Sequence, residues 1–134
     1  MDFATLLAEG VDRWNEWRSR YPLIPCTLAG KNLSNGYFFE CNLRGVDLSG
    51  ANLRRACLIG ADLRWADLSE ADLSGAYLSE ANLLGARLNN ANFANANMEK
   101  ITLPQSYCVN EGVAQKNLLN FSPTWIESLH HRVV

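Results

Sequence analysis

Residues 61–75 read ADLRW ADLSE ADLSG, three consecutive copies of one five-residue unit. Each copy begins with alanine, continues with aspartate and leucine, and ends with two variable residues. When this register is extended in both directions, an apolar residue returns every five positions, sixteen times without a break: Leu28, Leu33, Phe38, Leu43, Leu48, Leu53, Leu58, Leu63, Leu68, Leu73, Leu78, Leu83, Leu88, Phe93, Met98 and Leu103. An internal repeat of five residues therefore decides the fold.

A period of five fits neither regular secondary structure. Five residues turn an α-helix by about 500°, so successive leucines would share no face. On a continuous strand, where side chains alternate, an odd step would send every second leucine to the opposite face. All the leucines can be buried only if the chain turns a corner in each unit. Alanine and leucine then point inwards, the residue between them points outwards, and the last two residues form the corner.

Four corners close a square, so one coil takes twenty residues and residues 26–105 form four coils. At a spacing of roughly 4.8 Å between coils, the stack is about 19 Å tall. Proline, which would interrupt pairing between coils, does not occur between residues 26 and 103. We therefore predict an all-β solenoid, a quadrilateral β-helix of about four coils.

The repeated units resemble the pentapeptide repeat family, whose motif is A-(D/N)-L-x-x. The resemblance covers 80 of the 134 residues and implies the fold of that family, a right-handed quadrilateral β-helix. It also implies a bacterial source, since members of this plain type are abundant in cyanobacteria and most have no assigned role. The first coil departs from the motif, because Cys26, Lys31, Gly36 and Cys41 hold the alanine position. We expect the stem of Lys31 to cover the end of the stack while its ammonium group stays in solvent.

Caps are predicted at both ends, because a solenoid exposes its core there. An N-terminal cap at residues 1–25 is predicted to contain one helix within residues 2–19, with Asp2 as its N-cap and with an apolar stripe at helical spacing: Phe3, Leu6, Leu7, Trp14 and Trp17. Residues 106–134 lose the repeat and are predicted to form a C-terminal cap or tail. Thr124 and Glu127 predict a capping box for a short helix there.

Composition excludes several classes of protein. The net charge of −2 gives no strong basic field for nucleic acid. No apolar run reaches the roughly 18 residues of a membrane span, and the acidic N-terminus lacks a signal pattern. We therefore expect a cytoplasmic protein with neither a nucleic-acid partner nor a membrane partner. The cysteines have no C-x-x-C spacing, which predicts free thiols and no metal site: Cys26, Cys41, Cys57 and Cys108.

Stacking the sequence in steps of twenty reveals two neighbouring outward columns of unusual composition on one side. Most outward positions hold Asp or Asn, which we expect to hydrogen-bond between coils, and the outward arginines are expected to be solvated. One side instead carries Tyr37, Phe39, Cys57, Ile59 and Tyr77. These five residues predict an apolar patch, which Trp65 and Leu84 are expected to extend around one corner. The alternatives left open are a protein partner, self-association, and a surface covered by residues 118–125 of the same chain.

No catalytic constellation is recognisable. Both histidines lie outside the repeat, no glycine loop suits a phosphate, and a filled core leaves no pocket. We therefore predict a non-enzymatic protein without catalytic residue, cofactor or metal, and favour a protein-interaction scaffold that uses the patch.

The resemblance implies one alternative, because some relatives imitate duplex DNA and bind type II topoisomerases. DNA carries one negative charge per about 1.7 Å, so a stack of this height would need about 11 of them. Residues 26–105 hold eight acidic and seven basic residues. The balanced charge and the short rod disfavour this alternative, and an enzymatic role is disfavoured further.

Overall fold

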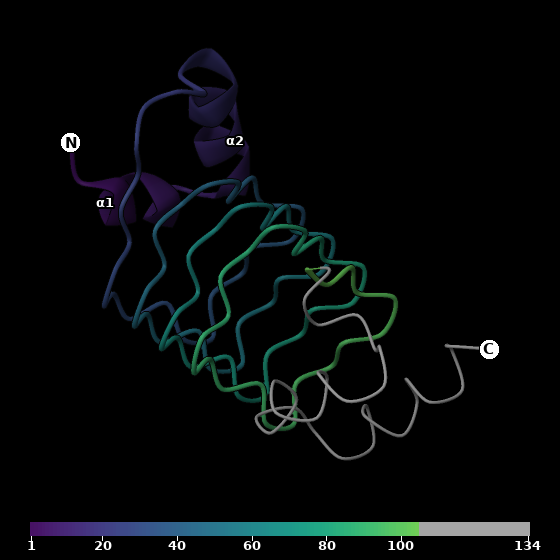
Figure 1. Ribbon diagram of the computed structural model, residues 1–134. Coiled ribbons are helices and arrows are strands. Elements are labelled where there is room, and N and C mark those ends of the chain that lie inside the picture. The colour runs from purple at the N-terminus through teal and green to yellow at the C-terminus, as the bar shows by residue number, and fades with distance from the viewer. Residues whose placement is uncertain (105–134) are drawn as a thin grey trace.

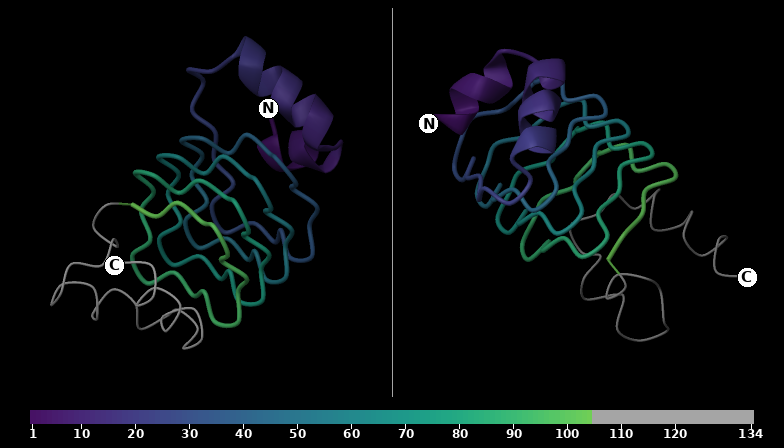
Figure 2. Two further views of the ribbon diagram at one scale, coloured as in Figure 1. Left: turned by 90° about the vertical axis from the view of Figure 1, so that its right-hand side faces the viewer. Right: turned by 90° about the horizontal axis from the view of Figure 1, so that it is seen from above.

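The chain winds as a stack of coils that starts beneath two helices. The computed structural model describes residues 1–104 (Figures 1 and 2). Helix α1 spans Phe3–Ala8 and helix α2 spans Val11–Arg20. Both lie at one end of the stack, and the last described residues lie at the opposite end (Figure 1). The C-terminal cap predicted for residues 106–134 and the covering segment 118–125 lie outside the described residues.

Backbone pairing repeats every twenty residues. Among residues 1–104, parallel bridges join each outward residue to the one twenty positions later, from Thr27 and Asp47 to Asn82 and Thr102. The outward columns define four faces, named here in chain order: face 1 (Thr27, Asp47, Asp67, Arg87), face 2 (Asn32, Asn52, Asp72, Asn92), face 3 (Tyr37, Cys57, Tyr77, Asn97) and face 4 (Asn42, Asp62, Asn82, Thr102).

A tight turn follows every inward leucine or its equivalent. The carbonyl of Leu48, for example, accepts a hydrogen bond from the N–H of Ala51 at 3.0 Å. The last residue of each unit has a φ between 54° and 73°, the left-handed value that a type II turn requires at its third position. Glycine adopts this φ without strain. Several corners use larger residues, whose side chains run along the column towards the next coil, as Trp65 does over Gly85.

The outward Asp and Asn side chains brace the corners of their own units, rather than forming the expected hydrogen bonds between coils. Ion pairs do link neighbouring coils, between Asp67 and Arg87 at 3.8 Å and between Asp72 and Arg54 at 3.6 Å. The carboxylate of Asp67 accepts a hydrogen bond from the N–H of Ser69 at 3.0 Å, and the amide oxygen of Asn42 accepts one from the N–H of Arg44 at 3.2 Å. The same contact to the N–H two residues later is made by Asn32, Asp47, Asn52, Asp62, Asp72, Asn82, Asn92 and Asn97. These are Asx turns, in which a short side chain satisfies a corner N–H that the ladder leaves unpaired.

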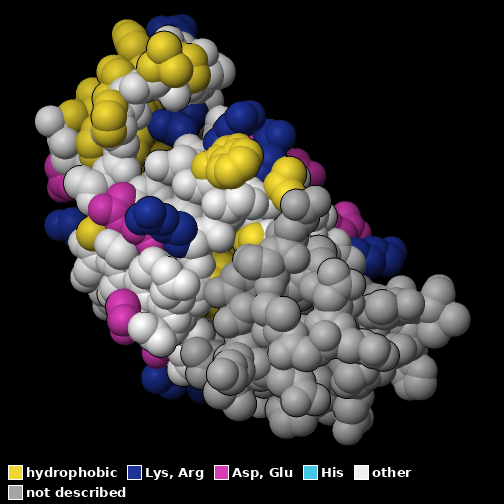
Figure 3. All heavy atoms as spheres, viewed as in Figure 1, with side chains coloured by type: hydrophobic (Ala, Val, Ile, Leu, Met, Phe, Trp, Pro, Cys, Tyr) yellow, Lys and Arg dark blue, Asp and Glu magenta, His cyan; other side chains and the backbone are white. Residues whose placement is uncertain are grey.

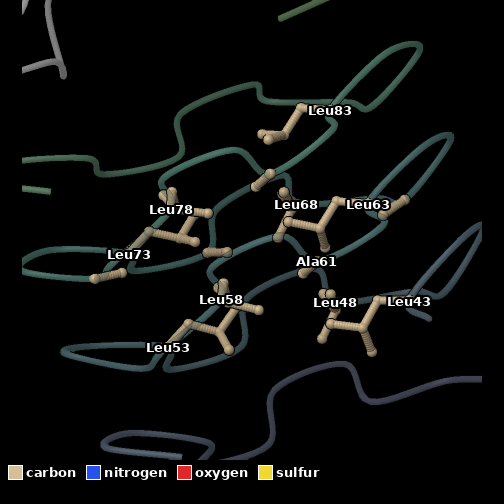
Figure 4. Close-up of a cluster of buried hydrophobic side chains, with 14 of the residues drawn as sticks. Leu43, Leu48, Leu53, Leu58, Ala61, Leu63, Leu68, Leu73, Leu78 and Leu83 are labelled. Atoms are coloured by element: carbon tan, nitrogen blue, oxygen red, sulfur yellow. The ribbon is translucent and has the colours of Figure 1, made fainter. Parts of the chain in front are cut away.

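The core is a stack of leucine layers with alanine at the sides. Leucines of successive coils point into the interior, where they are fully buried (Figure 4). In the first coil the larger Phe38 replaces leucine, and its ring lies 2.3 Å from where a Cβ on residue 36 would stand. Glycine is therefore required at position 36 as long as Phe38 fills the layer. Lys31 is exposed, and the apolar residues that pack over this end come from the helices.

The N-terminal cap consists of two helices rather than the single one predicted. Gly10, with a φ of 117°, separates α1 from α2 and is the N-cap of α2. Trp14 of α2 is fully buried, and its indole N–H donates a hydrogen bond to the carbonyl of Asn42 at 2.7 Å. The amide of Asn15 adds two further bonds, donating to the Glu40 carbonyl and accepting from the N–H of Asn42. Helix α2 is thus attached to the first coil by packing and by specific hydrogen bonds.

We expect Trp14→Ala to lower the free energy of unfolding by about 3–5 kcal/mol. The change empties a fully buried site and leaves the carbonyl of Asn42 without its donor. Chemical denaturation measures the loss, with the half-buried Trp17→Ala as comparator. Equal losses for the two variants would contradict the anchoring role of Trp14.

Stability should fall in acid, because carboxylates that brace corners have lowered pKa values. Hydrogen bonds from Ser69 lower the pKa of Asp67. Burial raises the pKa of Asp72, but the hydrogen bonds from Ser74 and the charge of Arg54 together outweigh burial and lower it. The unfolded chain, with an ordinary value of 3.8, therefore binds more protons in acid. The stabilisation is complete above about pH 5 and is lost as the pH falls through and below the ordinary value.

Asn braces a corner without titrating, so the double variant Asp67→Asn with Asp72→Asn should lose less stability than the wild type between pH 5 and pH 3. Thermal unfolding at both pH values measures this difference. An identical loss in the two proteins would show that these carboxylates do not contribute.

Candidate interaction face

Face 3 presents the apolar residues that the sequence places on one side. Tyr37 is 72% exposed, Tyr77 51% and Phe39 40%, whereas Cys57 and Ile59 are half-buried. The rings of Tyr37 and Phe39 stack with their centres 6.3 Å apart. Bridges join Tyr37 to Cys57 and Cys57 to Tyr77. The backbone ladder therefore brings the outward members of the patch into one continuous column.

Three outward residues of the same column cannot brace their corners. Tyr37, Cys57 and Tyr77 occupy the positions at which Asp or Asn accepts a hydrogen bond from the N–H two residues later. The corresponding N–H groups belong to Phe39, Ile59 and Ser79. Asn97, at the end of the column, still braces its corner by accepting a bond from the N–H of Glu99. Three successive coils of face 3 thus replace a stabilising side chain with an apolar or aromatic one.

Charged residues of opposite sign lie along the two edges of face 3. The corner shared with face 2 carries Arg54 and Arg55, both exposed. The corner shared with face 4 carries the exposed acids Glu40, Glu80 and Glu99, together with Lys100. The apolar column therefore has a basic edge and a mainly acidic edge.

Trp65 and Leu84 lie away from this patch. Both are exposed, at 59% and 41%, and the backbone N–H of Trp65 donates to the carbonyl of Leu84. They occupy the corner between face 4 and face 1. The polar column of face 4 separates this corner from face 3, so the two residues do not extend the patch as the sequence suggested.

The buried thiols of the first coil are not poised as nucleophiles. Cys26, Cys41 and Cys57 are free, while Cys108 lies outside the described residues. Burial raises the pKa of Cys41 to about 12. Burial also raises the pKa of Cys26, although the nearby guanidinium of Arg18 opposes it. Both thiols therefore stay protonated near neutral pH, which leaves them unreactive.

Residues 1–104 contain no cluster of three or more His, Cys, Asp or Glu side chains suited to a metal ion. Over the same residues, neither helix is long and apolar enough to cross a membrane.

Sequence reasoning missed a buried arginine. Arg18 lies on α2, one turn after Trp14, and is only 6% exposed. Its guanidinium donates to the carbonyls of Ile24 and Arg44 and to the Sγ of Cys26. Spacing offers the one available signal, because Arg18 follows Trp14 by four residues and so shares its buried side of the helix. The structure thereby joins α2 to Arg44, which the sequence placed in a solvated column.

Comparison with known proteins supports the repeat assignment. A family model described as pentapeptide repeats matches residues 32–69 and 66–105, which together span more than half of the chain. No protein with curated function matches.

Solved structures of pentapeptide repeat proteins align with parts of the chain. Rfr23 from the cyanobacterium Cyanothece 51142 is 30% identical, with a TM-score of 0.42, over 57% of this chain and 56% of its own. HetL from the cyanobacterium Nostoc sp. strain PCC 7120, described as involved in heterocyst differentiation regulation, is 29% identical, with a TM-score of 0.33, over 61% of this chain and 51% of its own. QnrB1, described as a plasmid-mediated fluoroquinolone resistance protein, is 25% identical, with a TM-score of 0.39, over 55% and 48%.

This chain therefore spans about half the length of each of these three structures. The length of the family match and the twenty-residue bridge spacing agree on one assignment. The chain belongs to the pentapeptide repeat family, whose members form right-handed quadrilateral β-helices.

Proposed function

We propose that this chain is a non-enzymatic, cytoplasmic protein-binding module that acts through face 3, and that the partner this face fits is a second copy of the chain. The loss of three corner braces in one column carries the proposal. A brace contributes on the order of 1 kcal/mol, so replacing three of them with exposed apolar residues costs stability. This loss of stability is offset only if the apolar surface binds a partner.

The charged edges of face 3 determine how two copies can meet. When two copies face each other across a two-fold axis parallel to the stack, the basic edge of each opposes the acidic edge of the other. A two-fold axis across the stack would instead oppose like charges, which is unfavourable. The favourable arrangement is isologous, as most homodimers are.

In this arrangement coils at the same level meet. Arg55 of one copy then faces the corner at Gly60 of the other. Glu40 and Glu80 flank that corner, each one coil, or about 4.8 Å, away. An arginine side chain is long enough to reach either carboxylate. The apolar column is short, so the contact is smaller than a standard interface and we expect weak association.

Pentapeptide repeat proteins are generally not enzymes, and we extend this to the present chain. The alternative of a DNA mimic finds no support in the charge, since the repeat is almost neutral. A protein-binding role also gives a purpose to the exposed arginines and glutamates along both edges of face 3, which can pair with charges on the partner.

Sedimentation of the purified chain over a range of concentrations tests the proposal. We expect reversible self-association in the wild type, and its loss when Tyr37→Ser, Ile59→Asn and Tyr77→Asn are combined, because the apolar contact is removed. A wild type that stays monomeric throughout, or a triple variant that associates equally well, would contradict it.

Charge variants test the orientation. Arg55→Glu should weaken association, since it places a carboxylate between Glu40 and Glu80 of the other copy, and adding Glu80→Arg should restore it. Arg87→Glu makes the same change on face 1 and should have no effect. An equal effect from Arg87→Glu would mean that net charge, rather than the edges of face 3, controls association.

We also expect Tyr77→Asn alone to leave the free energy of unfolding unchanged or to raise it by up to about 1 kcal/mol, because asparagine can brace the N–H of Ser79. Chemical denaturation at a concentration where the chain is monomeric measures this effect. Leu78→Ala, one residue further along, should cost about 2–5 kcal/mol. A large loss from Tyr77→Asn would show that Tyr77 is needed for packing rather than for contact.

A further inference from the structure

A second surface feature lies where the N-terminal cap meets the coils. An open hollow of about 440 Å³ is bordered by the end of α2, the segment that follows it, and the corner between faces 4 and 1. Arg18, Arg44, Arg64, Asp62 and Trp65 contribute to its lining. Lys and Arg side chains gather beside hydrophobic ones in this region of the molecule (Figure 3). The volume is within the range of small-molecule sites.

The charges around this hollow do not balance. Arg64 and Asp62 neutralise each other through two hydrogen bonds, of 2.8 and 2.7 Å. Within residues 1–104, no carboxylate forms an ion pair with Arg18 or Arg44. The positive charge of Arg44 also helps to lower the pKa of Asp62, so this one carboxylate serves both arginines. The lining thus holds three guanidinium groups against a single carboxylate.

The burial of Arg18 makes the missing negative charge energetically costly. Its partners are two carbonyls and a thiol, all neutral, and its Nε is buried without any hydrogen-bond partner among the described residues. A buried guanidinium is stable only when a counter-charge or a full set of acceptors compensates for its lost hydration. An anion in the hollow would supply that charge close to both Arg18 and Arg44.

Trp65 adds a flat apolar wall. One part of its indole lies against Gly85, where a Cβ would stand only 2.2 Å from the ring. More than half of the side chain is still exposed. In the same column, a Cβ on Gly45 would have no neighbour within 4 Å. The space beside the indole is therefore open on the side of the first coil, where Arg44 lies.

We propose that this hollow binds a small phosphorylated ligand that carries a flat ring, such as a nucleoside monophosphate. The phosphate lies against Arg44 within the field of Arg18, and the ring stacks on the exposed part of Trp65. Arginine is suited to phosphate because its planar group donates two parallel hydrogen bonds. Stacking on an aromatic side chain adds an apolar contribution that inorganic phosphate cannot make.

Calorimetric titration of the full chain with adenosine monophosphate, adenosine and inorganic phosphate tests this proposal. Adenosine monophosphate should bind at least roughly tenfold more tightly than either fragment, because only it engages both walls. Arg44→Gln should weaken binding by roughly tenfold or more, and added salt should weaken it too. Arg87→Gln, at an exposed arginine of the fourth coil on face 1, is the matched control and should leave the affinity unchanged.

Three outcomes overturn the proposal: no binding of adenosine monophosphate, equal binding of inorganic phosphate, or equal losses in Arg44→Gln and Arg87→Gln. A second measurement does not need a ligand. Gly45→Glu places a carboxylate in the hollow, at a corner conformation that Glu40, Glu70 and Glu80 already adopt. This variant should be more stable than the neutral, equally large Gly45→Gln and should no longer bind adenosine monophosphate. If Gly45→Glu is the less stable of the two, the hollow does not lack an anion.

Discussion

Parallel pairing between residues twenty positions apart is the constraint on which the rest of the structure depends. In the first three coils, the N–H of each inward leucine, or of Phe38 in its place, donates to a carbonyl one coil further on, so a coil can be neither lengthened nor shortened without breaking the ladder. Because the period is fixed, every column of the sequence becomes a column on the surface. The leucine layers, the left-handed corners and the Asx braces all repeat with it. Any residue that departs from the repeat pattern can therefore be assigned to a specific position on a specific face.

This regularity separates architecture from function. Outward Asp and Asn residues contribute to stability by bracing corners, and the buried leucines contribute by excluding water. Tyr37, Cys57 and Tyr77 contribute to neither role in the described chain, and they replace the braces in three successive coils. Arg18 and Arg44 stand out for a different reason, because among the described residues neither forms an ion pair with a carboxylate. Face 3 is proposed as a site because it lacks braces that the repeat usually supplies, and the hollow because its positive charges outnumber the carboxylates.

Sequence periodicity was sufficient to predict the coils, because one residue type recurs at a spacing that no helix or single strand can bury. It was also sufficient to place Tyr37, Phe39, Cys57, Ile59 and Tyr77 on one side, since columns follow from the period alone. It failed where the geometry within a unit matters. The direction of an Asp or Asn hydrogen bond depends on which N–H the corner leaves unpaired, and this cannot be derived from spacing. The width of face 4, which separates Trp65 and Leu84 from the patch, is likewise a property of the folded coil.

Contacts between the cap and the coils were beyond sequence reasoning altogether. The hydrogen bonds from Trp14 and Arg18 to the first coil join segments without a shared period, so no register relates them. The break at Gly10 was not predicted either, because the continuous apolar stripe indicated one helix while the glycine allowed the chain to turn.

Amide hydrogen exchange resolved by residue tests most directly the claim that face 3 gives up stability for contact. The N–H groups of Phe39, Ile59 and Ser79 lack the brace that protects the N–H groups of Ser49, Ser69 and Ser74. In dilute solution the first three should exchange faster, and they should become protected as the chain is concentrated, while the braced corners stay unchanged. Equal protection of both sets at every concentration would contradict the claim, because face 3 would then have lost no stability and gained no contact.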